Sequence, residues 1–141
     1  MNKGFQLDVK WHDNDLLEVR ITAWNGAFGG AADVYLPIGG LRETAEKLSG
    51  FPRNPTDKRE VLFGRFGPVQ AGGAVGMRFY GADGAGHTYV ESKIESDNQI
   101  AGVNESVVLS ILIEPAALDS FVEDLRRLDA EKTGAACLCA V

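Results

Sequence analysis

The sequence predicts an α+β protein in which a strongly twisted antiparallel β-sheet, able to curl into a sandwich, is closed on one face by a C-terminal amphipathic helix. Three observations lead to this class. Apolar side chains recur at every second residue in about seven short runs. Two other segments have the helical spacing of apolar residues. Glycine accounts for 17 of 141 residues, above the usual share of roughly 7%, which indicates many turns.

The N-terminal third is expected to form three strands, at residues 5–12, 16–24 and 31–38. The first strand alternates cleanly and places Trp11 on the apolar face beside Val9. Asp and Asn residues at 13–15 favour a tight turn, so the first two strands should form a hairpin. Pro37 cannot donate a ladder hydrogen bond, which predicts an edge or an exit at that end of the third strand.

The rest of the chain is expected to hold a short helix that ends at Gly50, strands at 61–66, 73–81, 87–96 and 106–113, and a helix at 114–128. Because short turns separate most strands and βα units do not alternate regularly, the strands should pair antiparallel. The strand at 106–113 carries no charge in eight residues, which predicts a central position in the sheet. Pro115 suits the first turn of the last helix.

Domain organisation and cellular location follow from the same patterns. Residues 1–128 are expected to form a single domain, and residues 129–141, which have no sustained periodicity, a flexible C-terminal tail. The first residues lack the apolar stretch of a signal peptide, and no eighteen apolar residues run together. We therefore expect a cytoplasmic protein with no membrane partner.

The net charge of −6 limits the kinds of partner that the protein can bind. Nucleic-acid binding needs clustered Lys and Arg, so a nucleic-acid partner is not expected. An acidic surface favours association with a basic protein partner through electrostatic steering.

The glycine-rich segment at 81–86, GADGAG, resembles a phosphate-binding loop in composition only. Such a loop must lead from a strand into a helix, whose first backbone amides hold the anion. Here the following residues, HTYVES, alternate with period two and predict a strand. The segment is therefore expected to be a hairpin turn that uses glycine for positive φ angles.

The two histidines, His12 and His87, fall on the polar faces of predicted strands. They are expected to be surface residues, and an acid–base pair between them, or with Asp13, Asp15 or Asp83, is the alternative. The segment HDND at 12–15 lacks the further ligands of a calcium loop. No nucleophile-elbow or zinc-protease motif is present. The sequence thus predicts no catalytic residue, no cofactor and no metal site.

Both cysteines, Cys137 and Cys139, lie in the predicted tail. Two thiolates supply only half of a structural zinc site. No disulfide framework is expected either, because both cysteines belong to the last five residues.

The aromatic residues opposite the main apolar faces are the candidates for a contact surface: Trp24, Tyr35, Tyr80 and Tyr89. For Trp24 a core position is the favoured interpretation, because large aromatic side chains are rarely exposed. If the four gather on one exposed patch, together with His87, that patch is a protein-binding surface.

Three segments resemble small uncharacterised bacterial domains of the kind found among toxin-immunity proteins: GLRETAEKLSGFP, GMRFYGADGAGHTYVES and SVVLSILIEPAALDSFVEDLRRL. The resemblance covers about residues 5–128. Such domains occur among proteins that neutralise a toxin and also as orphans of unknown role. The resemblance therefore implies an α+β fold and leaves both possibilities open, and it assigns no functional residue.

The favoured hypothesis is a non-enzymatic protein-binding module, with an immunity-like inhibitor as one form of it. A small enzyme or ligand binder that uses the polar sheet face near His12 and His87 is one alternative, which a concave pocket joining those side chains would support. A structural homodimer formed through a sheet edge is the other.

Overall fold

The computed structural model describes residues 2–67, 72–81, 87–97 and 104–141. Its elements in chain order are β1 (Gly4–His12), β2 (Leu16–Trp24), β3 (Gly29–Pro37), α1 (Gly40–Leu48), β4 (Lys58–Gly64), β5 (Ala74–Tyr80), β6 (Thr88–Glu95), β7 (Ser106–Ile113), α2 (Pro115–Glu131) and β8 (Ala135–Cys139). Neither helix in the described part of the chain has the length and apolar content of a bilayer-spanning segment.

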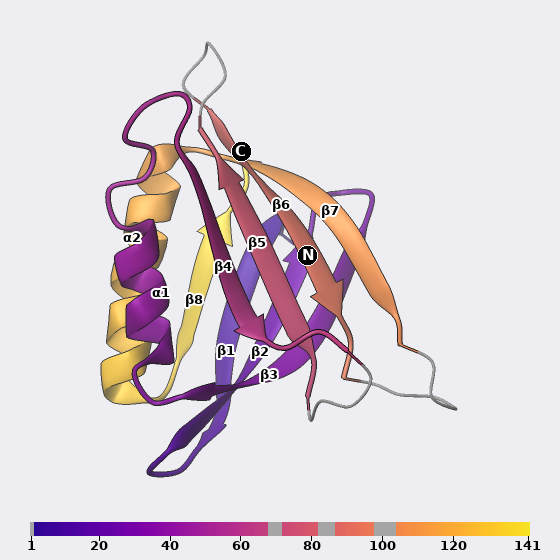
Figure 1. Ribbon diagram of the computed structural model, residues 1–141, viewed down its shortest axis with the longest axis vertical. Helices are drawn as coiled ribbons and strands as arrows, with labels where there is room; N and C mark the ends of the chain where they lie inside the picture. Colours follow the sequence, from indigo (N-terminus) through magenta and orange to yellow (C-terminus); the bar gives the residue numbers. More distant parts are fainter. Residues whose placement is uncertain (1, 68–71, 82–86, 98–103) are drawn as a thin grey trace.

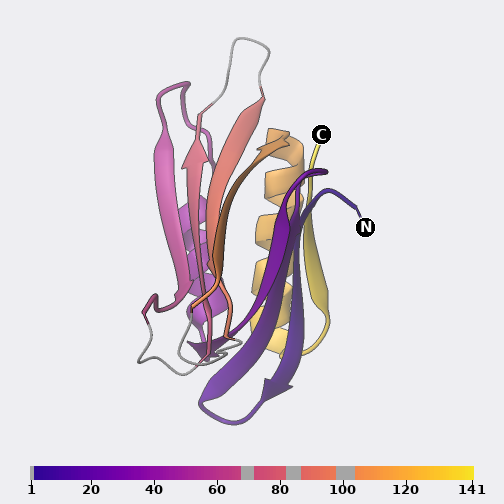
Figure 2. The same cartoon turned by 90° about the vertical axis from the view of Figure 1, so that its right-hand side faces the viewer.

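The strands form two four-stranded antiparallel sheets, which confirms the α+β class. The first sheet has the order β3-β2-β1-β8 and the second the order β4-β5-β6-β7. Figure 1 shows the second sheet in front of the first, with β3 crossing behind it, and β3 contacts every strand of the second sheet. Helices α1 and α2 pack side by side (Figures 1 and 2); α2 also contacts β8, whereas α1 contacts β3 and β4.

One continuous core lies between the sheets and the helices. The alternation predicted for the strands is confirmed, since the inward side chains of β2, β3, β5 and β6 are buried while their neighbours face outward. The apolar stripe of α2 is buried as its spacing predicts; it consists of Leu118, Phe121, Val122, Leu125 and Leu128.

Two contacts tie α1 to the rest of the fold. The carboxylate of Asp129, buried in α2, accepts a hydrogen bond of 3.0 Å from the backbone N–H of Gly39 at the start of α1. Beyond the other end of α1, the ring of Phe51 meets the ring of Phe79 on β5 edge to face, with 5.9 Å between centroids. Both ends of α1 are therefore held by residues distant in sequence.

The C-terminal residues differ from the predicted flexible tail. Helix α2 continues to Glu131, and the chain then reverses through Lys132 and Gly134, both with positive φ. Strand β8 pairs antiparallel with β1, and its Ala136 and Leu138 side chains are buried in the core. A five-residue strand is too short to show a clear period, and it forms because β1 offers a free edge and α2 an apolar surface.

Trp11 was expected in the core and is instead 49% exposed. A β-bulge between Val9 and Trp11 inserts one residue into β1. Because side chains alternate with period two, one extra residue moves Trp11 to the outer face, opposite Glu18 on β2. The alternation read from the sequence therefore fails after Val9.

Strand β7 was expected in the centre of a sheet and lies at the edge of the second one. Its inward residues Leu109, Ile111 and Ile113 are buried, but on the opposite face Val108 is 59% and Leu112 is 42% exposed. The absence of charge predicts burial on both faces, and within this chain only one face is buried.

Candidate functional site

The outer face of the second sheet is a grid of side chains whose rows the strand register fixes. The upper row is Lys58, Tyr80, Tyr89 and Leu112; the middle row is Glu60, Arg78, Glu91 and Ser110; the lower row is Leu62, Gly76, Lys93 and Val108. Directly opposite side chains on neighbouring strands lie close enough to interact. We call these twelve residues, with Phe66, the outer face of the second sheet.

The upper row is aromatic and apolar. The Tyr80 and Tyr89 rings stack with 4.7 Å between centroids and 13° between planes. The ammonium group of Lys58 lies 5.7 Å from the Tyr80 centroid, within the range of a cation–π contact. Leu112 extends the row onto β7 and is 42% exposed. The row thus presents a flat apolar surface with one cation at its end.

The middle row is charged. Arg78 Nε lies 2.9 Å from Glu60 Oε1, and both side chains are largely exposed. Because solvent screens such a pair, it adds little to stability and serves mainly to hold the two side chains in place.

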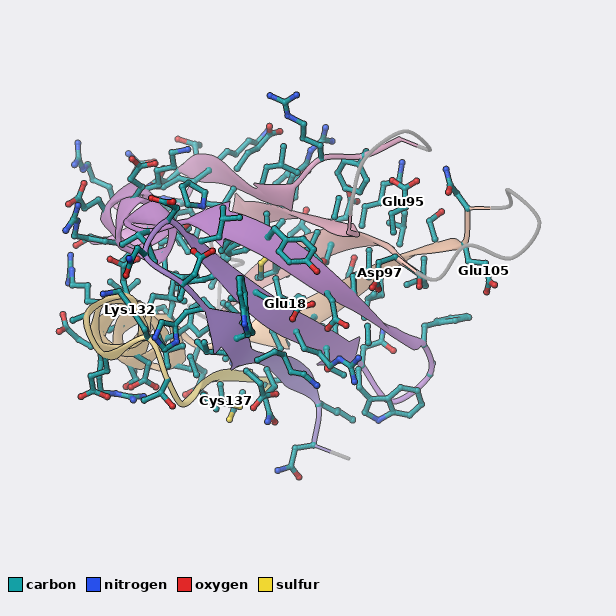
Figure 3. All side chains as sticks on the ribbon, turned by 90° about the horizontal axis from the view of Figure 1, so that it is seen from below. Glu18, Glu95, Asp97, Glu105, Lys132 and Cys137 are labelled. Atoms are coloured by element: carbon teal, nitrogen blue, oxygen red, sulfur yellow. The ribbon has the colours of Figure 1, made fainter. Side chains whose placement is uncertain are left out.

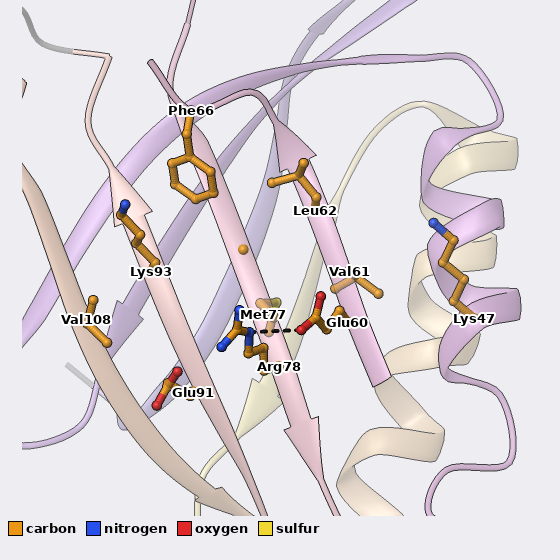
Figure 4. A pocket seen from close by; sticks show the side chains of 11 residues that line it. Lys47, Glu60, Val61, Leu62, Phe66, Met77, Arg78, Glu91, Lys93 and Val108 are labelled. Carbon is orange, nitrogen blue, oxygen red and sulfur yellow. Dashed lines mark ion pairs between the residues drawn. The ribbon is translucent and has the colours of Figure 1, made fainter. Parts of the chain in front are cut away.

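Between the middle and lower rows lies an open hollow of about 520 Å³. Gly76 has no side chain and forms its floor, and Phe66 lies along one side, where a Cβ atom added at Gly76 would come within 3.3 Å of the ring. Figure 4 shows Leu62 and Lys93 on opposite sides of this floor, with the Glu60–Arg78 pair of the middle row beside it. Lys93 Nζ lies 4.8 Å from the Phe66 centroid, so the ring is held against the sheet.

The residue types around the hollow are apolar and charged. Its lining contains apolar side chains, three cations and two carboxylates, and none of the described lining residues is a histidine, a cysteine, a serine or a threonine. One carboxylate, that of Glu60, is already paired with Arg78.

The predicted contact residues do not gather on one patch. Tyr80 and Tyr89 meet on the outer face of the second sheet, and His87 directly precedes β6. Tyr35, which is 42% exposed, belongs to the first sheet. Trp24 is also on the first sheet, partly buried above Gly29 and not in the core as expected.

The residues that complete the face were missed by sequence reasoning, namely Leu62, Phe66, Gly76, Val108 and Leu112. The signal that could have found two of them is the uncharged strand at 106–113. A strand apolar on both faces needs a cover for each of them, and the fold supplies a cover for one.

The two histidines lie far apart. His12 ends β1 beside the β1–β2 turn, and His87 precedes β6; in Figure 1 these places are at opposite ends of the molecule. The alternative of an acid–base pair between them therefore has no support, and Asp83 lies outside the described residues. Among the side chains that the structure describes, no three His, Cys, Asp or Glu residues are grouped so as to hold a metal ion.

The HDND segment forms a turn, which agrees with the prediction from its Asp and Asn residues. The Asp13 carboxylate accepts hydrogen bonds from the backbone N–H groups of Asp15, at 2.8 Å, and Leu16, at 2.7 Å. These bonds hold the pKa of Asp13 below its usual value. Of the glycine-rich segment, residues 82–86 lie outside the described part, but strand β6 and not a helix follows it.

The outer face of the first sheet is polar in comparison. Arg20 and Asp33 form a two-point ion pair across β2 and β3, with distances of 2.8 and 3.0 Å. The hydrogen bonds and the charge of Arg20 hold the pKa of Asp33 below its usual value. Nearby, a hydrogen bond to Glu18 raises the pKa of Tyr35.

We expect Asp33→Asn to lower the free energy of unfolding modestly at neutral pH and not at all in strong acid. A depressed pKa in the folded state means that ionised Asp33 stabilises the fold above its unfolded-state pKa, and that this contribution is lost as pH falls through the folded-state pKa. Urea unfolding at about pH 7 and about pH 2.5 measures the difference. Arg20→Gln should give the same loss at neutral pH, and a loss that is independent of pH would contradict the assignment.

Comparisons of the chain with protein-family models, with curated protein sequences and with solved structures return no match.

Proposed function

We propose that the protein is a non-enzymatic binding module whose protein partner docks on the outer face of the second sheet. The observation that carries the proposal is β7: it has no charged residue, and yet Val108 and Leu112 are exposed. An uncharged edge strand with an apolar outer side is a solubility liability for an isolated protein. A partner that covers this side accounts for its composition.

The shape of the face supports the same proposal. Leu62 and Val108 are each more than half exposed and flank the hollow over Gly76. A projecting apolar side chain of the partner fits such a hollow, and fully desolvated contacts of this kind dominate binding energy at protein interfaces. The Tyr80–Tyr89 stack beside it supplies a rigid aromatic surface, which loses little conformational entropy on binding.

The charges around the face refine the kind of partner. Four basic side chains, Lys47, Lys58, Arg78 and Lys93, stand against two acidic ones, Glu60 and Glu91. Although the whole chain is acidic, this face favours an apolar projection bordered by carboxylates. The basic partner suggested by net charge is therefore not the one that this surface favours. Masking of a toxin, implied by the resemblance to immunity proteins, is one form that such binding takes.

A homodimer formed by pairing of β7 edges is less favoured, because the edge of β7 is already in use. The Asn25 side-chain amide donates to Ser110 O at 3.2 Å, and the Val141 N–H donates to Leu112 O at 2.9 Å. These contacts occupy outward backbone acceptors that an added strand would need. The face of the sheet, and not its edge, is therefore the proposed docking surface.

The proposal is tested with two matched double variants as baits in a pull-down from native cell extract. Leu62→Arg with Val108→Arg places two cations on the proposed face, and Gln6→Arg with Ala31→Arg places two on exposed positions of the first sheet. We expect wild type and the control to retain the same protein in comparable amount. The face variant should retain at least about tenfold less, because a lost central contact costs more than about 1.4 kcal/mol.

Equal retention by all three baits, or a monomeric wild type that retains no specific protein, would contradict the proposal. Light scattering of the purified proteins runs in parallel. A wild-type dimer that becomes monomeric only in the face variant would identify the partner as a second copy of this chain.

A further inference from the structure

The two cysteines form a pair of adjacent thiols on β8. Cys137 and Cys139 are two residues apart in one strand, so both side chains leave the same outer face, and both are exposed. Their sulfur atoms lie 2.9 Å apart. Figure 3 shows Cys137 directed outward from β8, at the margin of the first sheet. In the sequence both cysteines fall in a stretch without sustained periodicity, which does not predict this arrangement.

Strand geometry allows a bond between these thiols but disfavours it slightly. Two residues of an extended strand span about 6.6 Å, near the upper limit of about 6.8 Å for the Cα atoms of a disulfide. Strand β8 has five residues and pairs with β1 alone, so a local shortening disturbs the ladder with one strand only. Because a strained and exposed disulfide is reduced more readily than a relaxed one, a bond here would be reversible.

We propose that Cys137 and Cys139 are a redox site that closes reversibly into an intrastrand disulfide, with a low-molecular-weight disulfide as the oxidant. In the first step one thiolate attacks the external disulfide, forms a mixed disulfide and releases one external thiol. In the second step the other cysteine attacks the mixed disulfide, closes the protein disulfide and releases the second external thiol. The protein loses two electrons and two protons, and the external disulfide gains both.

The surroundings of the pair assign the order of attack. Partial shielding of the Cys137 thiol from water and the neighbouring Cys139 thiol raise the pKa of Cys137 to about 11, which keeps Cys137 protonated at neutral pH and makes it a poor first nucleophile. Cys139 therefore makes the first attack, and Cys137 closes the bond. Between them, Leu138 is fully buried opposite Phe5 of β1, so closing the bond acts directly on the strand that completes the first sheet.

The test uses the full chain, reduced and then incubated with glutathione disulfide, and reads the products by intact mass and peptide mapping after alkylation of the remaining thiols. Wild type should lose two hydrogen atoms, carry no glutathione and return to the dithiol with dithiothreitol. Cys137→Ser should hold one glutathione on Cys139 as a stable mixed disulfide, because its resolving thiol is missing. Cys139→Ser should react more slowly than Cys137→Ser.

Both serine variants replace exposed side chains, and circular dichroism serves as the control that they are folded. Three results would overturn the proposal: wild type that accumulates glutathione on its cysteines, wild type that forms disulfide-linked dimers, or wild-type thiols that stay unmodified.

Discussion

Removal of residues 135–141 is expected to lower the free energy of unfolding by at least about 4 kcal/mol. The truncation deletes β8, whose Leu138 is 0% and Ala136 is 2% exposed. It also leaves Phe5 and Leu7 of β1 without the neighbours that cover them, and removes the ladder between β1 and β8. Chemical denaturation followed by tryptophan fluorescence and by circular dichroism measures the loss.

Two substitutions in β8 separate the contribution of its buried side chains to stability from that of its exposed ones. Leu138→Ala keeps the strand and removes one buried side chain, and should cost about 2 to 4 kcal/mol. Cys137→Ser changes an exposed position of the same strand and should be nearly neutral. A truncated protein as stable as wild type would instead restore the picture of a flexible tail.

Phe79→Ala is expected to lower the free energy of unfolding by about 3 to 5 kcal/mol. Phe79 is 0% exposed on β5 and packs edge to face against Phe51, which follows α1. Its removal therefore leaves a cavity in the core and also loosens the link between α1 and the second sheet. The same denaturation experiment measures the change, and amide exchange in α1 should report the loosened link.

The neighbouring residue Arg78 provides the control. It points to the opposite face of β5, and its ion pair with Glu60 is solvent-exposed, so Arg78→Ala should change stability little. Equal losses of unfolding free energy in Phe79→Ala and Arg78→Ala would contradict the description of β5 as a strand with one buried and one exposed face.

The strands and helices were predicted well where period and length were both sufficient. Residues 16–24 form β2 with Leu17, Val19 and Ile21 inward, as the alternation predicts. The predicted helix at 114–128 forms, with Pro115 in its first turn, and extends to Glu131. These elements depend on local spacing, which a sequence displays directly.

The candidate site was predicted only in part. Tyr80 and Tyr89 were predicted to lie opposite the main apolar faces, and both lie on the outer face of the second sheet, where their rings stack; their role as contact residues stays a prediction. Their neighbours Phe66 and Gly76 were not predicted as part of a site. The hollow beside them arises from the register of the strands and from the Phe66 ring, which lies against Gly76. Neither is visible in residue spacing.

By itself, the sequence determined the α+β class, the seven longer strands, both helices and the side of most strands that faces the core, because a period of 2 or 3.6 residues decides these locally. Only the tertiary structure decided the division into two sheets, the edge position of β7, the exposure of Trp11 and the existence of β8. Each of these depends on which distant strand or helix offers a free edge or an apolar surface. That is settled by long-range packing, and no local pattern records it.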